Sequence, residues 1–164
     1  MKTVTKLLFV CGMSVSLSAS ETLFFGFEAS NSAYKAKDET NSYKTDSDID
    51  YGLRVGAKAG SIRGILALNK YSGDHNDATY VTYQVDKLFS DSNVQPFVGA
   101  HVGYGRYKSD HFSTTSRWMA GVQTGIVMDF VEQVDIEVFY RHSFVDSNNI
   151  DGHGNTGIAL NFPF

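Results

Sequence analysis

Large apolar side chains occupy every second position near the end of the chain, at Ile158, Leu160, Phe162 and Phe164. Successive side chains of a strand point to opposite faces, so this period of two predicts a strand with one apolar and one polar face. Similar alternation recurs in earlier segments, although both faces of one of them carry apolar residues. These segments cover residues 23–29, 50–59, 62–71, 79–87, 95–106, 117–128 and 134–142.

The spacing of these segments predicts how they are arranged. Each has about ten residues, which is the length that a tilted strand needs to cross a bilayer. Long polar segments, at 34–49, 72–78, 107–116 and 144–152, alternate with short turns between the predicted strands. Long loops outside and short turns in the periplasm are typical of outer-membrane barrels. We therefore predict an all-β fold, an eight-stranded antiparallel up-and-down transmembrane β-barrel.

The polar faces of the predicted strands carry more charges than a soluble barrel of this size buries. The interior of an eight-stranded barrel is just filled by side chains, so charges that face it must pair. We predict that pairs centred on Glu137 and Arg141 plug the lumen. A gated path for small ions is the alternative use of the same residues. The predicted interior charge network consists of Arg54, Lys58, Arg63, Asp135, Glu137 and Arg141.

Aromatic residues sort by strand end in the predicted arrangement. Phenylalanines gather near the short turns, whereas tyrosines and the tryptophan gather near the long polar segments. Membrane interfaces favour such aromatic belts, because the ring lies in lipid and the polar tip lies among headgroups. We predict an aromatic girdle made of Tyr51, Tyr71, Tyr104, Trp118 and Tyr140.

Residues 1–20 have the layout of a secretory signal peptide, with a basic start, a short apolar core and small residues before the cut. We expect cleavage after Ser20, with Ala19 as the alternative, which leaves residues 21–164 as the barrel. Cys11 lies inside this segment, and the bulky residues beside it disfavour a lipoprotein acylation site. The mature chain then has no thiol, which suits an oxidising compartment.

Charge excludes one class of partner. Removing two lysines with the signal peptide leaves 12 basic against 18 acidic residues, a net charge of −6. An acidic chain without a basic stripe is a poor ligand for nucleic acid. We expect no nucleic-acid partner and no cofactor.

Three stretches of the chain resemble the small eight-stranded outer-membrane barrels, the OmpA/OmpX-like family. They are residues 95–105 (QPFVGAHVGYG), residues 134–141 (VDIEVFYR) and the terminal Phe164. The resemblance covers the mature chain as a pattern and implies the outer membrane of a Gram-negative cell, in contact with lipid and lipopolysaccharide. In that family the outer-membrane assembly machinery recognises the last strand, so the resemblance implies that Ile158, Leu160, Phe162 and Phe164 form this signal. Pro163 departs from the usual pattern because it removes a ladder donor.

Candidate catalytic and metal-binding residues are few. His142 and Ser143, with Asp146 nearby, have the residue types of a catalytic triad, but neighbouring strand residues point to opposite faces. A metal could bind His75 with Asp74 and Asp77, or His111 with Asp110. Scattered loop ligands of this kind are more often solvated, so we predict no metal site.

These observations favour a structural, surface-exposed barrel that is not an enzyme and whose loops are available for interaction. The first alternative is a narrow, porin-like channel for small solutes. A lipid A-modifying enzyme and a secreted soluble barrel that binds an apolar ligand are further alternatives.

Overall fold

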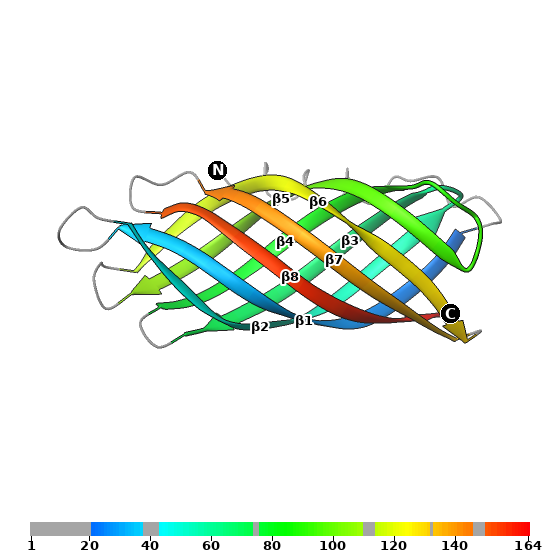
Figure 1. Ribbon diagram of the computed structural model, residues 1–164, viewed down its shortest axis with the longest axis horizontal. Coiled ribbons are helices and arrows are strands. Elements are labelled where there is room, and N and C mark those ends of the chain that lie inside the picture. Colours follow the sequence, from blue (N-terminus) through cyan, green and yellow to red (C-terminus); the bar gives the residue numbers. More distant parts are fainter. Residues whose placement is uncertain (1–20, 38–42, 74–75, 110–113, 132, 146–149) are drawn as a thin grey trace, which may run out of the picture.

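The computed structural model describes residues 21–37, 43–73, 76–109, 114–131, 133–145 and 150–164, so the predicted signal peptide lies outside it. Each strand pairs antiparallel with the next, and β8 pairs with β1 to close a barrel (Figure 1). This confirms the predicted fold. Within the described ranges, no helix is long and apolar enough to span a membrane. The strands are β1 (Glu21–Lys37), β2 (Tyr43–Ala59), β3 (Ile62–Ser72), β4 (Asn76–Leu88), β5 (Val94–Ser109), β6 (Thr115–Val131), β7 (Val134–Val145) and β8 (Ile150–Pro163).

The register of the strands sets the tilt of the barrel. Cross-strand partners lead from Ala29 through β2, β3 and β4 to Arg106 on β5. In the other direction they lead from Ala29 through β8, β7 and β6 to Pro96, also on β5. Pro96 and Arg106 are ten positions apart, which is the shear with which the sheet closes. A staggered closure of this kind tilts the strands by roughly 35–45° from the barrel axis, and Figure 1 shows them crossing it obliquely.

The strands are longer than the alternation of apolar residues predicts. β1 and β2 stay paired as far as Lys37 and Tyr43, so most of the segment 34–49, predicted as a loop, is strand. Ladder hydrogen bonds use only backbone groups, and a hairpin therefore continues where its side chains are polar on both faces. With 11 to 17 residues, most strands exceed the roughly 9–11 residues that a bilayer requires.

The connections between the strands are shorter than the predicted loops, with two to five residues each at the two ends of the barrel. At the short-turn end, β2 joins β3 through Gly60 and Ser61, and Gly60 has a φ of 56°. Only glycine adopts this left-handed conformation readily. We call the opposite end the long-loop end, after the long polar segments predicted there. Only three to five residues separate β1 from β2, β3 from β4, β5 from β6 and β7 from β8, because the strands extend into those segments.

The outer face of the barrel is apolar. Burial alternates along β3 and through the centre of β6, as it does in strands that have one buried and one exposed face. Val122 on β6 is 58% exposed, whereas the next residue, Gln123, is 4% exposed. The large side chains that a soluble protein would bury therefore cover the outside, and polar side chains fill the inside.

Two apolar layers enclose the polar centre of the lumen. The layer near the long-loop end contains Tyr71, Ala78, Tyr80, Tyr107, Met119 and Val145. The layer near the short-turn end contains Leu88, Phe97, Val127, Phe139 and Ala159. Charged groups between these layers are held away from bulk water, so they must satisfy one another.

Candidate functional site

The first half of the polar centre is a chain of alternating charges that crosses the lumen. Arg63 on β3 contacts Asp86 on β4 and Glu137 on β7, each at 2.7 Å. Its Nη1 donates a hydrogen bond to Glu137, while its Nε and Nη2 both donate to Asp86. The same Glu137 oxygen lies 3.2 Å from Nη2 of Arg54 on β2. Glu137 is therefore shared between two arginines.

Further contacts lead from Arg54 back to Asp86 and close a ring. Nη1 of Arg54 lies 3.4 Å from Glu28 on β1, and Glu28 lies 3.2 Å from Nη1 of Arg141 on β7. Arg141 Nε donates to Oε1 of Gln123 at 3.0 Å. The amide nitrogen of Gln123 donates to Asp86 Oδ1 at 2.5 Å. We call this closed circuit of six charged side chains and one amide the lumen ring.

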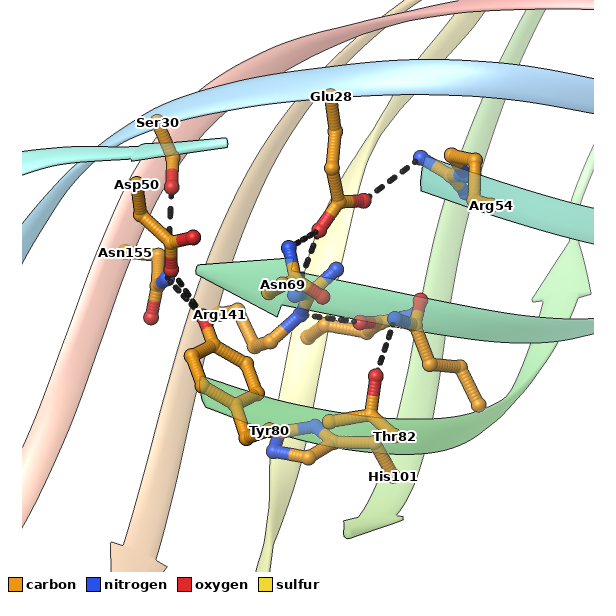
Figure 2. A network of polar contacts seen from close by, with 12 residues as sticks. Glu28, Ser30, Asp50, Arg54, Asn69, Tyr80, Thr82, His101, Arg141 and Asn155 are labelled. Carbon is orange, nitrogen blue, oxygen red and sulfur yellow. Dashed lines mark hydrogen bonds and ion pairs between the residues drawn. The ribbon is translucent and has the colours of Figure 1, made fainter. Parts of the chain in front are cut away.

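The lumen ring is electrically balanced, with three arginines against three carboxylates. Every member is at most 5% exposed. An unpaired charge at such depth would cost several kcal/mol, whereas alternating partners compensate one another. Figure 2 shows the part around Glu28, Arg54 and Arg141, where Asn69 also donates to Glu28. The members are Glu28, Arg54, Arg63, Asp86, Gln123, Glu137 and Arg141.

Four of the six charges predicted for the interior lie in the lumen ring: Arg54, Arg63, Glu137 and Arg141. The other two lie nearer the short-turn end, where both are only partly buried. There Lys58 Nζ donates to Gln95 Oε1 at 2.8 Å, and Lys58 and Asp135 both line a small cavity.

The predicted pairing of Glu137 with Arg141 is wrong. Glu137 is bound by Arg54 and Arg63, and Arg141 is bound by Glu28. Residues four apart on one strand share a face but are separated by about 13 Å along it. Partners from other strands are nearer, because the barrel brings them together across its narrow interior.

Sequence reasoning missed two carboxylates of the lumen ring, Glu28 and Asp86. Both lie on the inward face by simple alternation, Glu28 between Gly26 and Ser30 and Asp86 two positions from Gln84. The odd or even position of each residue along its strand, which we call its parity, could have identified both as lumen residues. Their partners could not be inferred from it, because parity says nothing about contacts between distant strands.

Glycines make room for the lumen ring. A Cβ added to Gly99 would lie 2.0 Å from Asp86 Oδ1, and one added to Gly26 would lie 3.2 Å from Cγ of Arg54. Missing side chains at these inward positions allow long charged groups to lie over the neighbouring strand.

A second polar cluster lies toward the long-loop end. Asp50 on β2 accepts hydrogen bonds from Tyr80 and from Nδ2 of Asn155, the latter at 3.1 Å (Figure 2). It also accepts one from Ser32 at 3.2 Å. Asn155 Nδ2 also lies 2.8 Å from Ser32 Oγ. Strands β1, β2, β4 and β8 are thus cross-linked inside the barrel.

The histidine and serine considered for catalysis lie on different faces, as their adjacency predicts. Ser143 is buried in the lumen, whereas His142 is partly exposed and packs edge-on against Phe144 outside, with ring centroids 4.8 Å apart. Ser143 instead pairs with His101, whose Nε2 lies 2.8 Å from its Oγ. His101 Nδ1 has no hydrogen-bond partner in the described part of the chain, so no carboxylate orients this histidine.

The outward aromatic residues include four of the five predicted for the girdle. Tyr51, Tyr104, Trp118 and Tyr140 are each 48–59% exposed, and the rings of Tyr104 and Trp118 meet at 5.2 Å. Tyr71 was placed in the girdle wrongly, because it is fully buried in the lumen. Tyr71 has an odd number, like the buried residues Ile65 and Asn69 of β3, so its side chain points into the lumen although it lies at the end of the strand.

The last strand closes the barrel with an aromatic cluster on its outer face. Phe162 stacks on Phe25 of β1 with ring centroids 5.1 Å apart, and Phe164 lies 6.4 Å from the same ring. The backbone N–H of Phe164 donates to Leu23 O at 2.9 Å. Ile158 and Leu160 also face outward, at 54% and 40% exposure. An assembly role for these residues stays a prediction.

No metal-binding cluster of three or more His, Cys, Asp or Glu side chains occurs among the residues that the structure describes. Of the considered ligands, Asp74, His75, Asp110 and His111 lie outside the described residues. Asp77 accepts a hydrogen bond from Ser72 at 2.9 Å.

Comparison with known proteins identifies the fold. No protein-family model and no curated protein sequence matches the chain. Neisserial surface protein A superposes with a TM-score of 0.73 at 15% identity, covering 87% of this chain and 97% of that one. OprH and the N-terminal β-barrel domain of OprF, both from Pseudomonas aeruginosa, give TM-scores of 0.64 and 0.61 at 16% identity. The match to OprH covers 87% of this chain and 99% of OprH. The match to the OprF domain covers 85% of this chain and 97% of that domain. The chain therefore has the fold of the small eight-stranded outer-membrane β-barrels.

Proposed function

We propose that this protein is a structural, surface-exposed β-barrel of a Gram-negative outer membrane, whose loops at the long-loop end are available for interaction. The observation that carries the proposal is the inverted distribution of polarity. Apolar side chains face outward around a closed barrel, while the lumen holds a balanced ring of charges. Lipid is the environment that such an exterior fits, because a soluble protein rarely exposes so large an apolar surface.

The interior disfavours a secreted, soluble barrel that binds an apolar ligand. Such a barrel needs an apolar lumen with free space, whereas this lumen is occupied by buried arginines, carboxylates and amides. The apolar set predicted from the alternation faces outward instead, with Leu53, Val122 and Ile158 each more than half exposed.

The lumen ring also argues against the alternative of a narrow channel. Its contacts run between β3 and β7, which are opposite strands of the closed sheet. A solute crossing the barrel would have to break several buried ion pairs, each costly to separate in a low dielectric.

A non-enzymatic role fits the positions of the nucleophile candidates. Ser143 and His101 touch, but they are only 1% and 5% exposed inside the lumen. A lipid substrate outside the barrel does not reach them. We therefore propose no lipid A-modifying activity for this pair.

The proposed partners are outer-membrane lipid and lipopolysaccharide, with the assembly machinery during biogenesis. The apolar exterior supports the first, and the outward aromatic cluster of β8 supports the second. The resemblance to the small outer-membrane barrels implies lipopolysaccharide and the assembly machinery as partners, and the apolar surface is compatible with both.

Cell fractionation with a heat-modifiability gel tests the proposal. The protein should remain in the outer-membrane fraction until detergent is added, and unheated samples should migrate differently from boiled ones, because a closed barrel resists detergent. Release of the protein by salt or osmotic shock alone would contradict a membrane location. Identical migration with and without heating would contradict a stable barrel.

A further inference from the structure

Three exposed cations gather on the outside of neighbouring strands near the long-loop end. Lys70 lies on β3, and Arg106 and Lys108 lie on β5. Lys70 pairs with Thr79 of β4, and Thr79 pairs with Arg106, so the two cations lie on one line across three strands. We call these three residues the basic patch.

The spacing of the basic patch suits a phosphate group. Two inter-strand steps of about 4.8 Å separate Lys70 from Arg106, and two residues along β5 separate Arg106 from Lys108 by about 7 Å. Long side chains reach a common anion over such distances, and arginine binds phosphate through several N–H donors. Asp77, which pairs in register with Lys108, leaves the group with an excess of positive charge.

The basic patch borders the apolar exterior directly. The next outward residues toward the membrane are Leu68, Val81 and Tyr104, which are 50%, 42% and 48% exposed. Tyr104 meets Trp118 beside them. Cations above an apolar and aromatic band lie at the level of lipid headgroups, with their aliphatic stems along the apolar surface.

The basic patch lies on two strands of the barrel, β3 and β5. Among the side chains that the structure describes at this end, Arg117 on β6 is a further exposed cation, but it shares the face of its strand with buried Met119. The protein as a whole is acidic, with a formal charge of −4. The basic patch therefore runs against the general charge of the chain. The corresponding neutral positions include Asn31, Ile49, Ser116, Phe144 and Thr156.

We propose that Lys70, Arg106 and Lys108 bind the phosphate groups of lipopolysaccharide in the outer leaflet. This inference rests on the proposed function, which places the long-loop end at the cell surface. Contact with an amphiphile explains why the cations border exposed Leu68 and Val81, since a free phosphate ion would gain nothing from apolar neighbours. Acyl chains cover the apolar band while the phosphates meet the basic patch.

The test compares the full-length mature barrel with a double variant, Lys70→Gln with Arg106→Gln. Both are refolded into neutral phosphatidylcholine nanodiscs, and binding of diphosphorylated lipid A is titrated by native mass spectrometry. The double variant should bind at least about tenfold more weakly, because each cation near an anionic surface contributes on the order of 1 kcal/mol. Lys87→Gln is the matched control, since Lys87 is an exposed lysine on the outer face of β4 at the other end.

Further arms separate the site from general charge effects. Dephosphorylated lipid A should bind the wild type and the double variant alike, and the charge-retaining pair Lys70→Arg with Arg106→Lys should keep most of the affinity. An equal loss for phosphatidylglycerol would overturn the assignment to lipopolysaccharide. If the wild type and the double variant both insert and bind lipid A with equal affinity, the basic patch is not the binding site, although the proposed function still stands. A wild type that never gives the heat-modifiable band would overturn the proposed function, and with it the location of the basic patch.

Discussion

Arg63 and Glu137 meet at 2.7 Å across the full width of the lumen. They are 74 positions apart in the chain and lie on β3 and β7, which face each other in the closed eight-strand sheet. Both side chains are at most 3% exposed. This pair is the contact through which the lumen ring connects opposite walls of the barrel.

A double-mutant cycle on this pair should show strong coupling. Arg63→Gln and Glu137→Gln should each lower the unfolding free energy by about 3–5 kcal/mol, because each strands a buried charge. The double variant should lose less than the sum, with a coupling of roughly 0.5–3 kcal/mol. Urea unfolding in lipid vesicles measures these values. Glu137 with Arg141 is the control pair and should couple less, since the two make no direct ion pair; additive losses for Arg63 and Glu137 would contradict the ring.

The unmodified barrel should not conduct ions. The lumen ring and the two apolar layers fill its interior, so planar-bilayer recordings should show no steady current. Glu137→Ala removes the carboxylate shared by Arg54 and Arg63 and should produce a leak. Val138→Ala, which changes an outward residue on the same strand, should stay closed. Steady conductance of the wild type would instead support the channel alternative.

The cost of an outward charge should depend on its depth. Val122 lies in the middle of β6, so Val122→Arg should destabilise the barrel by roughly 2–4 kcal/mol. Ser116→Arg, on the same face near the long-loop end, should cost only about 0–1 kcal/mol. The free energies of unfolding of the two variants are compared from refolding equilibria in vesicles of a single lipid. Equal costs at the two positions would mean that this face does not cross a bilayer.

Gly99→Ala should disturb the lumen ring. The added Cβ would lie 2.0 Å from Asp86 Oδ1 and 2.6 Å from Val85 O, and overpacking of this kind costs typically about 1–3 kcal/mol. Gly64→Ala is the control, because its Cβ would meet Tyr83 Oη at an ordinary 3.5 Å. Thermal or urea unfolding should separate the two variants. Similar stability of both would show that Asp86 is free to move away.

Deletion of Phe164 should impair membrane assembly more than stability. The side chain is 74% exposed, and its closest aromatic neighbour, Phe25, lies 6.4 Å away between ring centroids. Its loss from a refolded barrel should therefore cost less than the roughly 1.5–3 kcal/mol of a fully buried phenylalanine. Outer-membrane yield in cells is compared with stability after refolding. Phe89→Ala is the control, because Phe89 is also an exposed phenylalanine but follows β4, on the opposite side of the barrel from β8. Equal yields with and without Phe164 would contradict an assembly signal.

Alternation alone determined which way most side chains point. In a strand the two faces are set by position, so Ile158 and Leu160 outward, and Arg54 and Arg141 inward, followed from their neighbours. The same rule applied to Tyr71 would have placed it in the lumen, but its aromatic character and its place at a strand end pointed to the girdle. Strict parity was the stronger indicator, because a strand cannot turn over one side chain without shifting its register.

The lengths of the strands and the partners in the lumen depended on the closed sheet. Backbone pairing carried β1 and β2 beyond the apolar pattern, since ladder hydrogen bonds are indifferent to side-chain polarity. Glu137 was recognisable as an inward charge, yet its partners come from β2 and β3. Which inward charges meet is decided by the ten-residue shear, which offsets opposite walls by an amount that no local pattern encodes. The sequence by itself thus determined the two faces of the barrel, whereas the lumen ring arose only when closure brought distant strands within about 3 Å of one another.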